Sequence, residues 1–92
     1  MENSEIIIDC SNIKDKKELH EQFKIKFNFP DYYGMNWDAF WDCLTEKNNL
    51  PSKLIMKNFN NLKLILPKET RVFEKIIKDF MEENSNFKVE FN

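Results

Sequence analysis

The sequence predicts an α/β fold in which a three-stranded parallel sheet packs with about four helices. Short apolar runs that suit strands alternate with longer segments whose apolar residues recur at helical spacing. The segments between the strands are long enough to be helical crossovers, which parallel strands require. With 41% hydrophobic and 33% charged residues, the 92-residue chain has a globular composition and predicts a single domain over residues 1–92.

The first third of the chain predicts a strand and then a helix. Residues 6–8 are three consecutive isoleucines, which is the pattern of a strand covered on both faces. Asp15 and Glu18 resemble a capping box, so a helix should begin there. Its buried side is marked by Leu19, Phe23 and Phe27. Pro30 disfavours helical backbone before it, so this helix should end near residues 27–28.

The stretch from residue 30 to residue 44 holds the only glycine, both tyrosines and both tryptophans. Pro30 and Gly34 predict a short loop in which the glycine takes a backbone conformation that other residues resist. Asn36 is expected to cap the next helix. Apolar side chains then recur at one helical face, at Trp37, Phe40, Trp41 and Leu44.

The remaining elements follow from pattern and punctuation. Residues 46–49 predict a polar turn and residues 53–56 a second strand. Residues 58–66 suit either a helix or an extended segment before Pro67, whereas residues 68–82 carry the broad apolar face of a helix. Residues 87–91 alternate between apolar and charged side chains, as in a half-exposed strand.

Acidic side chains gather around the aromatic stretch. Residues 27–46 contain no lysine or arginine but four acids, namely Asp31, Asp38, Asp42 and Glu46. At about 100° per residue, Asp38, Asp42 and Thr45 share one helix face. Two carboxylates one turn apart repel each other by a few tenths of a kcal/mol. The pattern fits either a solvated acidic face or a binding surface for a basic partner. The neighbouring aromatic residues favour the binding surface.

Enzymes and nucleic-acid binders require residues that this sequence lacks. An acid/base pair needs two carboxyl groups in different environments, whereas Asp38 and Asp42 have nearly the same surroundings. No phosphate-binding glycine loop accompanies them. A surface that binds nucleic acid directly should be basic, and the most distinctive surface here is acidic. We therefore expect a protein ligand for a basic protein, and no enzyme.

The sequence also predicts no cofactor, no metal and no membrane segment. Cys10, Cys43 and the single histidine lack the spacing of a metal site. The cysteines are interpreted as small buried residues in a reducing compartment, and His20 as a surface residue of its helix without a chemical role. Because no signal sequence and no apolar run of membrane-spanning length is found, we expect a cytoplasmic protein.

The residues around the aromatic stretch resemble those of the barstar-type inhibitors of guanyl-specific ribonucleases. The matching residues are Pro30, Asp31, Tyr32, Tyr33, Gly34, Asn36, Asp38, Ala39, Trp41, Asp42, Cys43, Leu44 and Thr45. Weaker similarity covers nearly the whole chain, so the resemblance implies a barstar-like fold and a short helix within residues 58–66. It further implies an intracellular, antitoxin-like or immunity protein that is a monomer and forms a 1:1 complex with a barnase-like ribonuclease. The alternative is a barstar-like module that binds a different basic nuclease or toxin protein.

The resemblance also implies how such a protein would bind: an acidic helix and the loop before it would plug the active site of the ribonuclease. Asp42 would take the place of a substrate phosphate, and Asp38 would pair with bases at the rim. Tyr32 and Tyr33 would pack across the mouth of the cleft. Further contacts are implied for Gly34, Asn36, Ala39, Trp41, Thr45 and Asp79. Departures from the family pattern at Met35, Trp37, Glu46, Lys47 and Asp79 leave the identity of the partner open.

Overall fold

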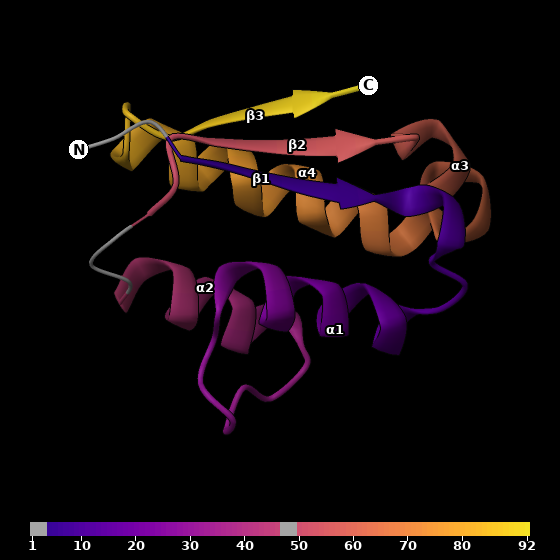
Figure 1. The fold of residues 1–92 in the computed structure, drawn as a ribbon, viewed down its shortest axis with the longest axis horizontal. Coiled ribbons are helices and arrows are strands. Elements are labelled where there is room, and N and C mark those ends of the chain that lie inside the picture. The colour runs from indigo at the N-terminus through magenta and orange to yellow at the C-terminus, as the bar shows by residue number, and fades with distance from the viewer. Residues whose placement is uncertain (1–3, 47–49) are drawn as a thin grey trace.

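The computed structural model describes residues 4–46 and 50–92 (Figure 1). The elements follow one another as β1 (Glu5–Asp9), the 3-10 helix η1 (Cys10–Asn12), α1 (Lys16–Phe27), α2 (Trp37–Glu46), β2 (Lys53–Lys57), α3 (Phe59–Ile65), α4 (Pro67–Glu83) and β3 (Lys88–Phe91). The strands form one parallel sheet in the order β1-β2-β3. The predicted α/β fold, with three parallel strands and four α-helices among the described residues, is confirmed.

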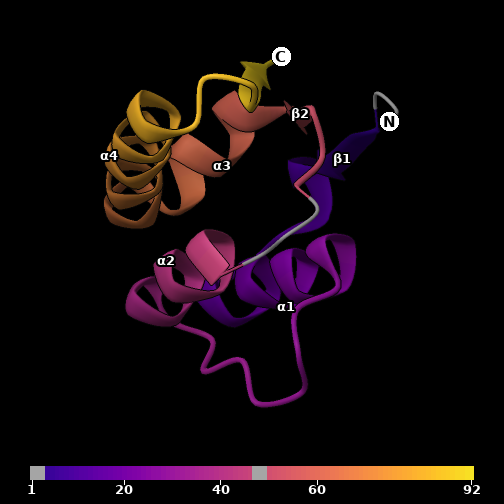
Figure 2. The same cartoon turned by 90° about the vertical axis from the view of Figure 1, so that its left-hand side faces the viewer.

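The helices gather on one side of the sheet and leave the other side open, as Figures 1 and 2 show. On the covered side, Ile8, Leu54 and Met56 are completely buried. On the open side, Ile7 is 46% exposed. The expectation that residues 6–8 are covered on both faces is therefore wrong. Because alternate side chains of a strand point to opposite faces, Ile6 and Ile8 point to the covered face and Ile7 points to the open one.

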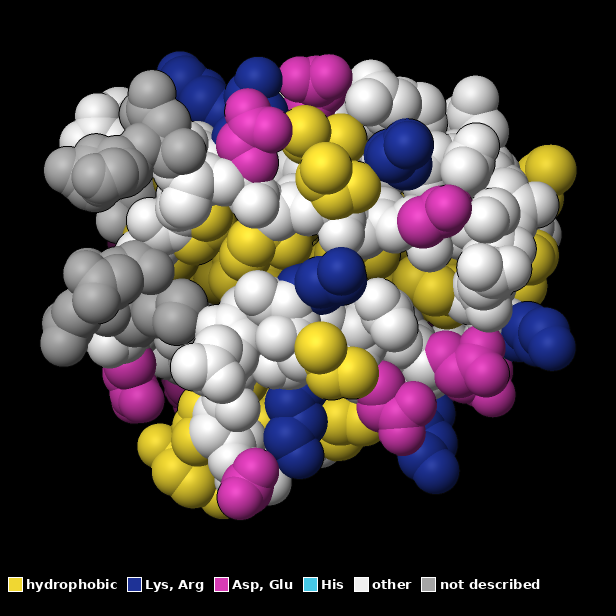
Figure 3. Space-filling view, in the orientation of Figure 1, with side chains coloured by type: hydrophobic (Ala, Val, Ile, Leu, Met, Phe, Trp, Pro, Cys, Tyr) yellow, Lys and Arg dark blue, Asp and Glu magenta, His cyan; other side chains and the backbone are white. Residues whose placement is uncertain are grey.

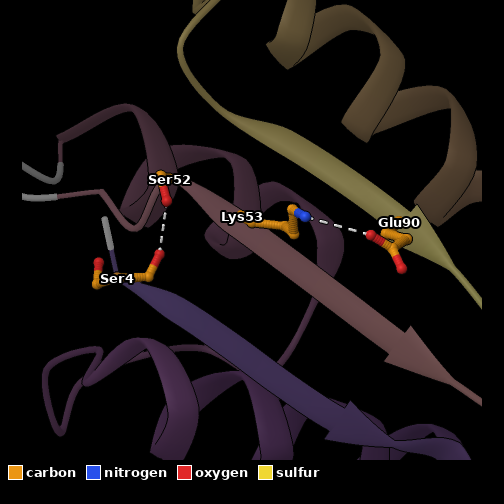
Figure 4. Close-up of polar contacts among 4 residues, drawn as sticks. All are labelled: Ser4, Ser52, Lys53 and Glu90. Atoms are coloured by element: carbon orange, nitrogen blue, oxygen red, sulfur yellow. Dashed lines mark hydrogen bonds and ion pairs between the residues drawn. The ribbon is translucent and has the colours of Figure 1, made fainter. Parts of the chain in front are cut away.

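Polar contacts join the strands at both ends. Where the strands begin, the Ser52 hydroxyl donates to the Ser4 carbonyl at 2.9 Å, and Lys53 pairs with Glu90 at 3.3 Å (Figure 4). Where β1 and β2 end, the Asp9 carboxylate accepts from the Asn58 side-chain amide at 2.9 Å and from the Ser11 backbone N–H at 3.0 Å. These two hydrogen bonds, the Asn58 bond first, lower the pKa of Asp9 to about 2.

The helix ends follow the local signals in the sequence. The Asp15 carboxylate accepts from the Glu18 N–H at 2.8 Å, and the Glu18 carboxylate reaches back to the Lys14 N–H at 2.7 Å. Helix α1 ends at Phe27, within the predicted range, and is followed by Asn28, which takes the left-handed conformation. The ambiguous residues 58–66 form the short helix α3, as the resemblance implied.

One predicted turn begins too early. Glu46 is the last residue of α2, so the polar turn expected from residue 46 does not include it. Residues 47–49, which complete that prediction, lie outside the described residues.

An aromatic cluster fills the space between the helices. Phe23 of α1 is completely buried, and its ring centroid lies 4.5 Å from that of Phe40 on α2 and 5.4 Å from that of Phe73 on α4. His20 belongs to the same cluster and is also completely buried. The expectation of a surface histidine is therefore wrong. Its spacing shows why: Phe23 and Phe27 follow His20 at i+3 and i+7, which places all three on one helix face.

Candidate functional site

The loop of residues 28–36, called the binding loop below, is shaped by turns and by close packing. The Tyr33 N–H donates to the Pro30 carbonyl at 3.0 Å. Gly34 does not adopt positive φ, and Met35 does so instead, at 57°. The predicted reason for the glycine is thus wrong. A Cβ atom at Gly34 would lie 3.2 Å from the Asn36 side-chain nitrogen, so this amide would have to shift by a few tenths of an ångström. The Ala39 Cβ, at 3.4 Å, would be at the edge of ordinary contact.

Asn36 joins the binding loop to α2. Its side-chain oxygen accepts from the Ala39 N–H at 2.8 Å, which confirms the predicted helix cap. Its side-chain nitrogen donates to the Gly34 carbonyl at 3.1 Å. One amide therefore fixes both the start of the acidic helix and the loop that precedes it.

We expect Asn36→Ala to lower the free energy of unfolding by about 1 kcal/mol, because an N–H in the first turn of α2 loses its partner. Asn36→Asp is the matched control, since aspartate keeps the acceptor and suits the positive end of the helix. Urea unfolding of the three proteins measures the difference. Equal losses in both variants would show that the cap is not the stabilising contact.

A groove of about 500 Å³ lies between α2 and α4. It is lined by Trp37, Asp38, Trp41 and Asp42 of α2 and by Ile76 and Asp79 of α4. Figure 2 shows these two helices side by side at the left of the molecule. Four of the residues predicted for the site, Asp38, Trp41, Asp42 and Asp79, thus meet in one place. The two lining residues not predicted for the site, Trp37 and Ile76, lie on the apolar helix faces that the sequence predicts to be buried.

The two tryptophans hold the walls of this α2/α4 groove together. The Trp37 indole N–H donates to the Glu69 carboxylate of α4 at 2.7 Å. The Trp41 ring packs edge-on against Phe80 of α4, with 6.0 Å between the centroids. The acidic helix is therefore anchored to its neighbour near both of the aspartates that it presents.

The charges of the α2/α4 groove are largely free to meet a partner. Asp38 and Asp42 are exposed, and within residues 4–46 and 50–92 no hydrogen bond or ion pair engages either carboxylate. Asp79 pairs with Lys75 of its own helix at 3.5 Å, a pair so exposed that it contributes little. By contrast, acidic and basic side chains are interspersed on the face that Figure 3 shows.

The two tyrosines of the binding loop lie in different environments. Tyr32 is 80% exposed and lines a separate hollow of about 160 Å³ with Pro30, Cys43 and other residues. Tyr33 is only 5% exposed. Its hydroxyl lies 2.6 Å from the Nδ1 atom of His20, and burial raises its pKa. Tyr32 is thus the tyrosine that offers a ring to a partner, whereas Tyr33 attaches the loop to the core.

The remaining predicted contacts lie outside the α2/α4 groove. Gly34, Asn36 and Thr45 are exposed, and Ala39 is partly buried. The Thr45 hydroxyl donates to the Asp42 carbonyl at 3.1 Å, one turn back along α2. These residues extend a possible contact surface from the groove along the helix and onto the binding loop.

Other kinds of site find little support in the part of the chain that the structure describes. No group of three or more histidine, cysteine or acidic side chains there is placed to hold a metal ion. Cys10 and Cys43 are free thiols, and burial raises the pKa of Cys10 to about 11, which disfavours the reactive thiolate. Among the described helices, none has the length and apolar character needed to span a bilayer.

Two comparisons with known proteins agree with this architecture. The family model described as Barstar (barnase inhibitor) matches residues 3–92. The chain is also 40% identical over 85 residues to the Bacillus subtilis (strain 168) protein named "Putative ribonuclease inhibitor YrdF", an alignment that covers 91% of this chain and 93% of that protein. Because both similarities extend over nearly the whole length, the resemblance is confirmed, and the chain belongs to the barstar family.

Proposed function

We propose that this protein inhibits a guanyl-specific, barnase-type ribonuclease by placing α2 and the binding loop in the enzyme's active site. The family and the name of the Bacillus relative support an inhibitory role toward a ribonuclease. The observation that carries the proposal is the α2/α4 groove, where three carboxylates from two helices line one surface beside two tryptophans.

The physical basis is imitation of RNA. A ribonuclease cleft binds the phosphates of its substrate with arginine, lysine and histidine side chains. Carboxylates on a rigid helix present similar charge to those side chains but offer no bond to cleave. In this arrangement Asp42 takes the phosphate position, Asp38 pairs with bases at the rim, and Asp79 adds a charge from α4.

Rigidity of the acidic helix favours such a complex. Binding is weakened whenever groups must be ordered at the interface. Here α2 is fixed beforehand by Asn36 at its start and by Trp37 and Trp41 against α4. The charges can therefore meet the cleft without a large loss of conformational entropy.

The binding loop supplies the rest of the contact surface in this proposal. The exposed ring of Tyr32 packs across the mouth of the cleft, and the backbone at Gly34 and the amide of Asn36 approach its edge. Ala39, Trp41 and Thr45 surround the two central acids. Because Tyr33 is buried, we revise its role from a direct contact to a residue that holds the loop.

A second candidate for the partner is a different basic nuclease or toxin protein. Trp37 favours this candidate, because a residue that departs from the family pattern lines the groove directly. A bulky indole beside Asp38 would alter the shape that the partner must match. In either case we propose a cytoplasmic, antitoxin-like monomer that forms a 1:1 complex.

The test is a titration of the purified protein into a barnase-type ribonuclease while RNA cleavage is followed. We expect activity to fall linearly and to vanish near one equivalent. A basic ribonuclease of another fold serves as the comparison. Loss of activity only in that second enzyme would favour the alternative partner, and no effect on either would reject inhibition of these enzymes. RNA turnover by the protein alone, if abolished by Asp38→Asn, would instead indicate an enzyme.

Association should be steered by charge. We expect the association rate to fall by roughly 10-fold or more as ionic strength rises from about 0.01 M to about 1 M, because the screening length shrinks from ~30 Å to ~3 Å. Stopped-flow mixing at several salt concentrations measures this rate. A rate that is independent of salt would contradict the proposed meeting of acids and bases.

A further inference from the structure

We propose that His20 is a positioning residue for the binding loop, and that protonation of its imidazole in acid releases the loop and weakens binding to the partner. The effect on binding rests on the proposed function. The release of the loop does not, because it concerns the free protein alone. His20 itself touches no partner in this proposal and acts through Tyr33 and Trp37.

The proposal begins from the contacts of the imidazole. His20 lies on α1 and is completely buried. Its Nδ1 atom lies 2.6 Å from the Tyr33 hydroxyl, and its ring centroid lies 4.5 Å from that of Trp37 at an interplanar angle of 61°. One side chain therefore contacts both the residue before Gly34 and the first residue of α2. In Figure 1 the loop projects below α1 and α2. The buried ring of Phe29 holds its first part to the core, and the contact of Tyr33 with His20 holds the part next to Gly34.

Hydrogen-bond accounting assigns the direction of the contact. The Nε2 atom of His20 is buried and has no hydrogen-bond partner among the described residues. If the proton is on Nε2, the Tyr33 hydroxyl donates to Nδ1 and only one buried donor remains unpaired. If the proton is on Nδ1, the Tyr33 hydroxyl hydrogen and the Nε2 lone pair are both left without a partner. The first arrangement leaves fewer buried polar groups unpaired and is therefore the more stable.

Protonation destroys this arrangement. In the imidazolium both ring nitrogens carry hydrogen, so Nδ1 can no longer accept from the Tyr33 hydroxyl. A positive charge would also lie among aromatic rings, without a carboxylate in contact with it among the described residues. Moving the loop away lets water reach both the charge and the hydroxyl. Loop release is thus the response that relieves the strain.

The charged groups around His20 set the pH range. Burial disfavours the imidazolium most, and Lys16 of the same helix adds to this effect. Glu69 of α4, the partner of Trp37, opposes it. Together they lower the pKa of His20 from 6.5 to about 4. The facing hydroxyl of Tyr33 stays protonated, since its own pKa is raised.

The sign of the pH dependence follows. A histidine whose pKa is depressed in the docked state stabilises that state fully above 6.5, and the stabilisation is lost as the pH falls towards 4. If release returns His20 to its ordinary value, the released-to-docked ratio rises about 100-fold between pH 7 and pH 4, since each unit of pKa difference is tenfold. We expect loop opening at a higher pH than unfolding of the whole domain, because opening disrupts far fewer buried contacts.

The free protein supplies the first test. Because the chain has one histidine, its ring signals in NMR spectra are unambiguous. We expect them to titrate well below 6.5, and the backbone amides of Tyr32 and Gly34 to shift with the same midpoint. In a Trp41→Phe background, Trp37 fluorescence should change at that midpoint as well. An ordinary histidine pKa, loop amides that stay unchanged, or global unfolding at the same midpoint would each overturn the proposal.

A matched pair of variants separates charge from packing. In His20→Asn an amide oxygen can lie near the position of Nδ1 and accept from Tyr33, but it takes no proton in this range. In His20→Leu the acceptor is absent at every pH. We expect the acid-induced shifts of the loop amides to vanish in the first variant, and the loop to be released already at pH 7 in the second. If His20→Asn proves too unstable to fold, Tyr33→Phe replaces it, and the shifts at Gly34 should shrink at least several-fold.

The second test measures affinity for a barnase-type ribonuclease at pH 7 and pH 4.5. The interface acids and the enzyme titrate in every sample, so the comparison uses the ratio of the two affinities. We expect this ratio to be at least several-fold larger for the natural protein than for His20→Asn. Equal ratios would overturn the proposed link to binding. If no variant binds the enzyme while the loop amides behave as expected, the proposed function is rejected, but the proposed release of the loop by protonation of His20 is supported.

Discussion

Asp42→Ala is expected to weaken binding to the proposed ribonuclease by several kcal/mol, or more than about 100-fold in Kd. In the proposed complex its carboxylate meets several basic side chains, whose charges the variant would leave unpaired. Losses of this size are known for charge pairs at the barnase–barstar interface, and the expected magnitude is taken from that complex. The fold should be unaffected, since Asp42 is exposed and no hydrogen bond of its carboxylate to the described residues is lost. Titration calorimetry measures the affinity, and circular dichroism checks the fold.

Asp31→Ala is the matched control for this experiment. Asp31 is also an exposed acid, but it lies in the binding loop and does not line the α2/α4 groove. Its removal deletes the same formal charge and should cost less than about 1 kcal/mol, as is typical of charges at the edge of an interface. If the two variants lose affinity equally, net charge and not the position of Asp42 governs binding, and the phosphate-mimicking role is rejected.

Phe23→Ala is expected to lower the free energy of unfolding by about 3–5 kcal/mol, because it opens a cavity that the surrounding rings cannot fill. Phe23 stacks on Phe73 of α4 and packs against Phe40 of α2, so one side chain joins three helices. For a domain of this size such a loss is a large part of the total stability. Urea unfolding measures it.

Phe91→Ala provides the comparison for the core variant. Phe91 is a phenylalanine of β3 that packs on Phe59 but remains 43% exposed. We expect its loss to be less than half of that at Phe23, since less apolar surface returns to water. Equal losses would mean that the aromatic cluster is not the centre of the core.

Most of the fold could be predicted from the sequence because its signals are local. Each of these signals acts within a few residues, and the structure follows them. They are the cap residues Asp15 and Asn36, the apolar spacing of α1, α2 and α4, and Pro30. The open face of the sheet was missed because three consecutive isoleucines do not reveal how many layers of helices are available. The role of Gly34 was misjudged for a related reason. The closest neighbour of a side chain there would be the Asn36 amide, whose position is set by its cap on the next helix.

The candidate site was predicted in part. Asp38 and Asp42 come from one helix, so their shared face could be inferred from spacing. Asp79 was suggested only by family resemblance, because nothing local shows that α4 packs beside α2. The burial of Tyr33 and its contact with His20 depend on long-range packing, which periodicity does not encode. The spacing of His20 with Phe23 was a usable signal, but the charged neighbours of the histidine outweighed it.

The order in which the chain is synthesised bears on when the protein can act. β1 pairs with β2 across 48 positions, with Ile6 opposite Leu54, and α2 is held by Glu69 and Phe80 of α4. Contacts this distant along the chain close slowly during folding. The acidic surface can therefore take its final shape only after α4 has emerged from the ribosome, and a nascent chain that carries only α1 and α2 should not yet form the proposed complex.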